Sequence, residues 1–236
     1  MSEVTRDELV LSYVRVRRAL GYLGLLFPFL LILGGYLSES DVLPSVSDYY
    51  HSTMRDIFVG SLFAIGVFLI SYKGHPLKDG EKLSDDIVAT IAGLSAFGVA
   101  IFPNEGGTGH PESMSQMILG LKIAAVGHYI SAIIFLGSLA YFCLVKFAKT
   151  ALPHRRRIYR ACGWFILLGG TLATVASYYK VYGTPAQSAF VVENRLVLWV
   201  EALGIWAFGI SWLTKGKAEF SRILPLLRHK PPNQKA

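Results

Sequence analysis

The sequence predicts an all-α integral membrane protein: a bundle of six transmembrane helices with both termini in the cytoplasm. Three observations support this prediction. The 236 residues are 53% hydrophobic and only 17% charged, whereas about a quarter of the residues in soluble domains are charged. The apolar residues form blocks long enough to cross the roughly 30 Å hydrocarbon core of a bilayer. The lysine and arginine residues gather on one side of these blocks.

The chain is expected to form one membrane domain over residues 1–236. Residues 1–19 are polar and contain Thr5 and Glu8 at the spacing of a capping box, which predicts an interfacial helix leading into the membrane. Residues 214–236 are expected to be a basic cytoplasmic tail. The six spans expected between these segments are Leu20–Leu37, Asp56–Tyr72, Asp86–Pro103, Leu119–Phe147, Ala161–Lys180 and Phe190–Leu213.

The distribution of basic residues predicts the orientation. Nineteen of the 23 lysine and arginine residues lie in the two terminal segments, the 73–85 loop and the 146–160 segment, so these parts are placed in the cytoplasm. This charge is expected to contact anionic lipid headgroups rather than nucleic acid. A bacterial inner membrane is the expected location. Glycines within the spans predict close helix packing, and they allow contact between copies of the chain.

The external segment 44–56, which reads PSVSDYYHSTMRD, is unusually dense in polar side chains. Asp48 and His51 are candidate site residues because no helix cap requires them. Asp56 has two interpretations. It either closes a capping box with Thr53 at the start of the second span, or it belongs to the site.

Other ionisable groups are expected at a similar depth. They are His128 in the fourth span and Glu193 and Glu201 in the sixth. Because a charged side chain at the bilayer centre costs at least about 2.5–3.5 kcal/mol, such groups normally face the protein interior. Steps of three and four residues predict that both glutamates lie on one helix face. Spans two, four and six enter from outside, so a pocket is expected in the outer half.

This pocket has the side chains for metal chemistry. His51, His128 and Glu193 are the candidate zinc ligands, because three such ligands hold zinc and leave a position for water. Carboxylates can then complete the site or act as general base. The candidate catalytic carboxylates are Asp48, Asp56 and Glu201. The predicted activity is zinc-dependent hydrolysis of a lipid amide or ester.

Three alternatives remain open at this point. The cluster could be a structural network in which His128 pairs with Glu201 and Arg195 pairs with Glu193 or Asp56. It could be the ion or proton path of a transporter or channel. The protein could also be a non-catalytic sensor of membrane homeostasis.

The overall arrangement resembles a known group of proteins. Six spans with cytoplasmic termini, and a first external loop with Pro44, Ser47 and Asp48 in a Pro-x-x-Ser-Asp pattern, are similar to bacterial six-span proteins akin to the FRAG–DRAM–Sfk family. This resemblance covers most of the chain. It implies a role in lipid handling and membrane homeostasis.

A second resemblance concerns one short motif. The run 47–51 is similar to the Ser-x-x-Tyr-His motif of the CREST superfamily, which includes alkaline ceramidases and progestin/adipoQ-type receptors. This resemblance implies that His51 binds zinc with Ser47 beside it, and that Asp56 matches the next aspartate of the superfamily. The closing His-x-x-x-His motif is absent, and the last span offers Glu193 and Glu201 instead.

Overall fold

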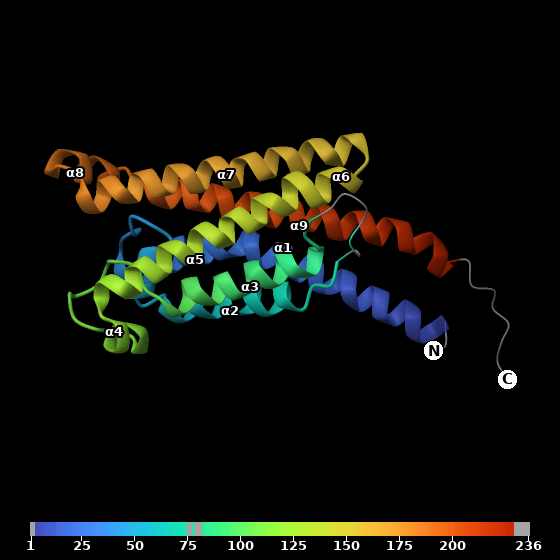
Figure 1. Ribbon diagram of the computed structural model, residues 1–236, viewed down its shortest axis with the longest axis horizontal. Helices are drawn as coiled ribbons and strands as arrows, with labels where there is room; N and C mark the ends of the chain where they lie inside the picture. The colour runs from blue at the N-terminus through green and yellow to red at the C-terminus, as the bar shows by residue number, and fades with distance from the viewer. Residues whose placement is uncertain (1–2, 75–76, 78–81, 229–236) are drawn as a thin grey trace.

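The computed structural model describes residues 3–74, 77 and 82–228, and the side chains of residues 14–74, 77 and 82–217. All regular structure in these ranges is helical (Figure 1). The elements are α1 (Glu3–Glu39), the 3₁₀ helix η1 (Ser47–His51), α2 (Arg55–Ile70), α3 (Asp85–Ile101), α4 (Met114–Leu119), α5 (Leu121–Tyr141), the π-helical segment η2 (Phe142–Phe147), α6 (Ala148–Thr150), α7 (Pro153–Tyr182), α8 (Pro185–Glu193) and α9 (Leu196–Arg228).

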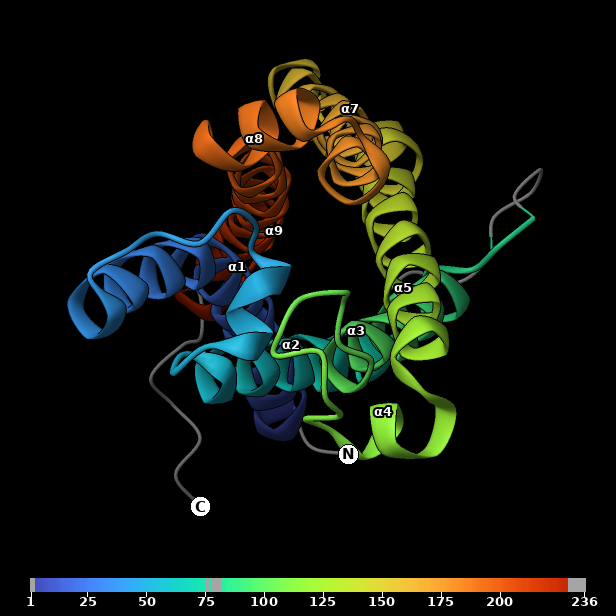
Figure 2. The same ribbon diagram turned by 90° about the vertical axis from the view of Figure 1, so that its left-hand side faces the viewer.

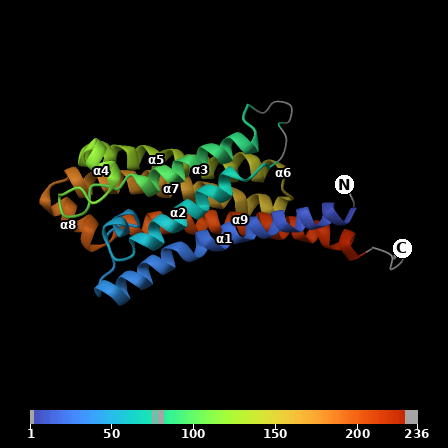
Figure 3. The same cartoon turned by 90° about the horizontal axis from the view of Figure 1, so that it is seen from below.

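The long helices of the described chain form a closed ring, as the view along the bundle shows (Figure 2). Around the ring the neighbours are α1, α9, α7, α5, α3 and α2, and α2 packs against α1 to close it. The start of α1 and the end of α9 lie at the same end of the bundle (Figure 3). Helices α4 and α8 lie at the opposite end, which we call the polar end because the clustered ionisable side chains described below are found there.

Within the described residues, four helical stretches are long and apolar enough to cross a membrane: Val14–Glu39, Leu121–Thr150, Pro153–Tyr182 and Leu196–Lys217. These stretches indicate that the chain is an integral membrane protein. Helices α2 and α3 are shorter, with 16 and 17 residues. At 1.5 Å per residue they extend about 24 and 26 Å.

The first five expected spans fall on α1, α2, α3, α5 with η2, and α7. Residues 3–19 are helical and belong to α1, which runs without a break from Glu3 to Glu39. Residues 214–228 likewise continue α9. The rest of the expected tail, 229–236, and residues 1–2 lie outside the described residues.

The sixth expected span is interrupted, which corrects the prediction that Glu193 and Glu201 share a helix face. Helix α8 ends at Glu193, and Arg195 adopts a left-handed backbone conformation with φ 49° before α9 begins. The Arg195 side chain holds this turn by donating to the carbonyl oxygen of Val42 and to the carboxylate of Asp41, both at 2.6 Å. Arg195 therefore forms its ion pair with Asp41, and its contact with Glu193 is a hydrogen bond of 3.3 Å to the backbone carbonyl oxygen.

Close helix contacts use several of the glycines that the sequence singled out. A Cβ atom on Gly93 of α3 would lie 2.6 Å from the carbonyl oxygen of Gly66 in α2, and one on Gly209 of α9 would lie 2.8 Å from the backbone nitrogen of Leu25 in α1. Larger side chains would push these helix pairs apart. Gly60 is different, because nothing lies within 4 Å of its Cβ position. Contact between copies of the chain stays a prediction.

A cluster of aromatic side chains closes the interior toward the other end of the bundle. Tyr72, Phe142, Phe147 and Trp212 are at most 3% exposed, and their ring centroids lie 5.0–5.9 Å apart in the recorded pairs. The basic side chains Arg17 and Lys215 lie over Tyr72 and Phe147 respectively. The interior at this end is thus filled with aromatic rings, and the basic side chains of Arg17 and Lys215 are buried beside them.

Candidate functional site

A serine and a histidine far apart in sequence meet at the polar end. The Oγ atom of Ser47, at the start of η1, lies 2.9 Å from Nε2 of His128 on α5. The other ring nitrogen of His128, Nδ1, lies 2.7 Å from the carbonyl oxygen of Phe102, which ends α3. A carbonyl can only accept, so Nδ1 carries a proton, and in the neutral ring Nε2 is left to accept from the Ser47 hydroxyl.

Asp48 follows Ser47 and forms the centre of an ionic network. Its carboxylate accepts hydrogen bonds from Nζ of Lys180 on α7, at 2.7 and 2.8 Å, and from the side-chain amide of Asn104 at 2.7 Å. Lys180 also lies 3.5 Å from the carboxylate of Glu105, which accepts a short hydrogen bond from the hydroxyl of Tyr129. This network connects η1, α5, α7 and the loop after α3.

His51 lies in a separate part of the same network. Its Nδ1 is 2.9 Å from the carboxylate of Glu112, and its Nε2 is 3.1 Å from the amide oxygen of Asn104. Both partners are acceptors, so both ring nitrogens act as donors in this arrangement. Two glycines let the loop approach the ring: a Cβ atom on Gly106 would lie 2.8 Å from the His51 ring, and one on Gly107 would lie 2.7 Å from it.

Glu112 is held in its ionised form by these contacts. The hydrogen bond from His51 is the largest influence, followed by hydrogen bonds from the backbone and hydroxyl of Thr108, and together they lower the pKa of Glu112 to about 2. The guanidinium of Arg55 lies 3.6 Å from the same carboxylate. The charged side chain of Glu112 therefore ties the loop between α3 and α4 to η1.

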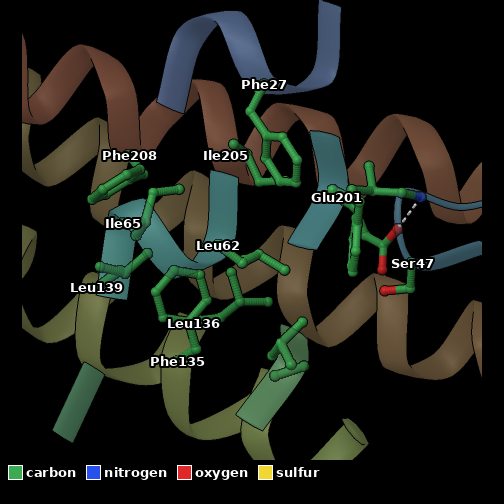
Figure 4. Close-up of a pocket in the computed structure, with 14 residues that line it drawn as sticks. Phe27, Ser47, Leu62, Ile65, Phe135, Leu136, Leu139, Glu201, Ile205 and Phe208 are labelled. Atoms are coloured by element: carbon green, nitrogen blue, oxygen red, sulfur yellow. Dashed lines mark hydrogen bonds between the residues drawn. The ribbon is translucent and has the colours of Figure 1, made fainter. Parts of the chain in front are cut away.

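Glu201, on α9, lies at the meeting point of two hollows. Its carboxylate accepts a hydrogen bond from the backbone N–H of Val46 at 2.7 Å. A central cavity of about 60 Å³ has Ser47 and Glu201 at one end and apolar side chains such as Ile65, Leu139 and Phe208 at the other (Figure 4). No hydrogen bond joins Glu201 to His128 among the described residues, so the expected pairing of these two is not seen.

A larger groove runs between α5 and α7. It has a volume of about 340 Å³ and is lined by apolar side chains from both helices, with His128, Tyr129 and Glu201 among its polar lining. Ile133, Leu167 and Val175 on its rim are exposed on the outer surface of the bundle. The groove shares Ala132, Leu136 and Glu201 with the central cavity, so the two hollows adjoin there.

The structure brings together four of the six candidate residues. Asp48, His51, His128 and Glu201 all lie at the polar end with the partners given above. Asp56 and Glu193 are exposed, and in the described part of the chain no hydrogen bond or ion pair joins either side chain to this network. Asp56 does not close a capping box either, because Met54 is the N-cap of α2 and makes no side-chain cap bond.

The pairing of Ser47 with His128 was not predicted. Five further residues of the network were not predicted as site residues: Asn104, Glu105, Glu112, Tyr129 and Lys180. The sequence carried a signal for Lys180, because it is one of the few basic residues on the sparsely charged side. Glu105 and Glu112 gave no such signal, since acidic residues in a loop rich in glycine are ordinarily solvated.

The arrangement of the candidate ligands does not fit a zinc ion. Both nitrogens of His51 donate to other groups, so neither offers a metal a lone pair, and Nε2 of His128 is engaged with Ser47. Within the described parts of the chain, no three His, Cys, Asp or Glu side chains are grouped to hold a metal. The zinc site stays a prediction, and no chemical step below passes through a metal.

Comparisons with protein-family models, with curated proteins and with solved structures find no match to this chain. The functional argument therefore depends on the geometry of the site.

Proposed function

We propose that this protein is a six-span membrane protein that takes a membrane lipid into the groove between α5 and α7 and holds the lipid's polar linkage at the polar end. The opposite end of the bundle from the polar end, which we call the basic end because the lysine- and arginine-rich segments lie there, would face the cytoplasm of a bacterium with both termini. The polar end would then lie near the outer leaflet. Helices α2 and α3 would complete the six crossings, assisted by the segments that flank them.

The observation that carries the proposal is the polar end of an otherwise apolar lateral groove. The volume of about 340 Å³ lies within the range of roughly 300–1,000 Å³ typical of ligand sites, which combine an apolar lining with a few polar groups. Its rim is formed by exposed apolar side chains on helices that face the bilayer. A hydrocarbon chain could enter from the side, while its ester or amide linkage reaches His128 and Glu201.

A through-going ion path is less well supported. The central cavity of about 60 Å³ is small and has apolar walls. Toward the basic end, the interior is filled by the aromatic cluster of Tyr72, Phe142, Phe147 and Trp212. An ion crossing there would have to leave its water behind, which costs several kcal/mol or more, and a cation would also meet the buried positive charges of Arg17 and Lys215.

The proposal can be tested by filling the groove with a larger side chain and measuring the loss of lipid contact. The purified full chain is placed in nanodiscs that contain phosphatidylcholine with a photoreactive diazirine in one acyl chain, and cross-linked residues are mapped by mass spectrometry. Gly137 lines the groove and has nothing within 4 Å of its Cβ position. We expect Gly137→Phe to reduce cross-links to groove residues at least tenfold.

Gly60 provides the matched control. It is also a helical glycine with open space around its Cβ position, but it lies on α2 and outside the groove. Gly60→Phe should leave the cross-links in the groove unchanged. Cross-links spread evenly over the outer surface, or equally affected by both substitutions, would exclude the groove as a lipid site.

A further inference from the structure

The Ser47–His128 pair has the arrangement of a nucleophile with its general base. We propose that Ser47 and His128 form a catalytic dyad that hydrolyses an ester of a membrane lipid through an acyl-serine intermediate. This inference rests on the proposed function, because the lipid must reach the dyad through the groove between α5 and α7.

The hydrogen bonds around the dyad fix the roles of its members. A serine hydroxyl becomes nucleophilic when a base within about 2.6–3.2 Å takes its proton and a third group orients that base. Ser47 Oγ lies 2.9 Å from Nε2 of His128, and the carbonyl of Phe102 holds the proton on Nδ1 at 2.7 Å. The backbone carbonyl thus does what an aspartate does in a Ser-His-Asp triad, which is to fix the tautomer and ring orientation.

The position of the dyad fits a substrate that arrives from the bilayer. Ser47 lines the central cavity and His128 lines the lateral groove. Their hydrogen bond therefore joins the two hollows, close to where Glu201 borders both. His128 is only 2% exposed, so bulk water has little access to the base. An ester whose acyl chain lies along the groove would place its carbonyl carbon beside the Ser47 hydroxyl.

Nearby carboxylates favour the charged base that forms during the reaction. Asp48 directly follows Ser47, and Glu105 is bonded to Tyr129, the neighbour of His128 in sequence. When Nε2 takes a proton, the negative charge of these carboxylates acts against the cost of forming an imidazolium in a buried site. Lys180 donates hydrogen bonds to Asp48 and lies 3.5 Å from Glu105, so it positions both carboxylates and offsets part of their negative charge.

The reaction balances without a further reagent except water. Ser47 Oγ attacks the ester carbonyl carbon as its proton moves to Nε2 of His128. The bond between the carbonyl carbon and the alkoxy oxygen then breaks, and the leaving alcohol takes the proton from Nε2. Water next gives a proton to Nε2 and its hydroxide to the acyl carbon. The fatty acid leaves, and Ser47 regains its proton.

A fluorophosphonate probe tests the dyad in the full chain in nanodiscs. Attack by Ser47 releases fluoride and leaves a phosphonyl group on Oγ, which mass spectrometry locates. We expect labelling of Ser47 that is lost in Ser47→Ala and slowed by 10²- to 10⁴-fold in His128→Gln, the usual contribution of a general base. Ser177→Ala is the control, because Ser177 lines the same groove.

Two results would overturn the dyad: no labelling of the wild-type protein above that of Ser47→Ala, or an equal loss in Ser177→Ala. The diazirine–lipid experiment is run on the same samples, and Ser47→Ala should keep its cross-links in the groove. Retained cross-links with an unreactive Ser47 would exclude the dyad alone. Absence of cross-links in the groove of the wild-type protein would exclude the proposed lipid site itself.

Discussion

Lys180 near the end of α7 donates two hydrogen bonds, of 2.7 and 2.8 Å, to the carboxylate of Asp48 in η1, 132 residues earlier in the chain. Their side chains are 15% and 12% exposed, so this ion pair is largely removed from water. The pair joins the helix that forms one wall of the groove to the segment that carries Ser47. It therefore sets the distance between the groove and the nucleophile.

Removal of the lysine charge should destabilise the protein strongly. Lys180→Met leaves the buried Asp48 carboxylate with Asn104 alone, and breaking a buried ion pair in this way costs about 3–5 kcal/mol. We expect a lower midpoint in thermal unfolding of the protein in detergent. The double variant Asp48→Asn with Lys180→Met should recover part of the loss. Lys122→Met is the control, because Lys122 is exposed on α5; an equal loss there would contradict the assignment.

The Glu112 contact should make the loop after α3 sensitive to acid. The pKa of Glu112 is lowered in the folded protein from 4.5 to about 2, so its stabilising contribution is complete above pH 4.5 and is lost as the pH falls toward 2. Pepsin digestion in nanodiscs measures this. Cleavage within residues 104–113 should increase over this interval in the wild-type protein.

Two variants complete that measurement. Glu112→Gln should be cleaved readily at every pH between 4.5 and 2, because it lacks the charged acceptor for His51. Glu193→Gln changes an exposed glutamate outside the network and should follow the wild-type profile, which also corrects for the pH dependence of pepsin. A wild-type-like profile for Glu112→Gln would show that the carboxylate does not hold the loop.

The two loop glycines offer a sharper test of the same region. Gly107 and Gly109 both have positive φ, 94° and 81°, so alanine is strained at either position. A Cβ atom at Gly107 would lie 2.7 Å from His51 and 2.8 Å from Glu112, whereas nothing lies within 4 Å at Gly109. Gly107→Ala should thus increase pepsin cleavage of the loop even near pH 4.5, the upper end of the tested interval. Gly109→Ala should increase it much less. Equal effects would mean that backbone strain alone matters.

Much of the helical arrangement could be predicted from the sequence, because hydrophobic block length reports directly on membrane helices. The failures occurred where local chemistry overrides the apolar pattern. The sixth span was predicted as one helix because apolar residues lie on both sides of Asn194 and Arg195. The left-handed turn at Arg195 is stabilised by Asp41 and Val42, which lie more than 150 residues away in sequence. Periodicity within one segment carries no information about such partners.

The site was only partly predictable for the same reason. His128 and Glu201 could be found because ionisable groups in apolar spans are costly and seldom lack a role. The partner of His128 is a serine, a residue common in membrane helices and loops, and its pairing depends on how η1, which packs against α2, reaches α5. The choice of Glu193 failed because it assumed one continuous helix.

Metal analysis of the purified protein bears on the zinc prediction. With both nitrogens of His51 donating and Nε2 of His128 bonded to Ser47, we expect far less than one zinc per chain after purification without added metal. Treatment with a chelator should then leave the reaction with the fluorophosphonate probe unchanged. One zinc per chain that is lost in both His51→Ala and His128→Ala would require the two imidazoles to turn toward a shared ion.

The proposed orientation predicts which residues can be reached from each side of the membrane. His110, in the loop that covers His51, and His154, at the start of α7, are both exposed and lie at opposite ends of the bundle. Each is replaced by cysteine in a background in which the buried Cys143 and Cys162 are changed to alanine. In intact bacterial cells, a membrane-impermeant maleimide should label the cysteine at position 110 and leave that at 154 unlabelled until the cells are permeabilised.

The physical reason is that segments rich in lysine and arginine are retained in the cytoplasm, and the 146–160 segment holds six of these residues. Labelling of position 154 before permeabilisation would show that the protein has the opposite orientation, with the Ser47–His128 pair at the cytoplasmic leaflet.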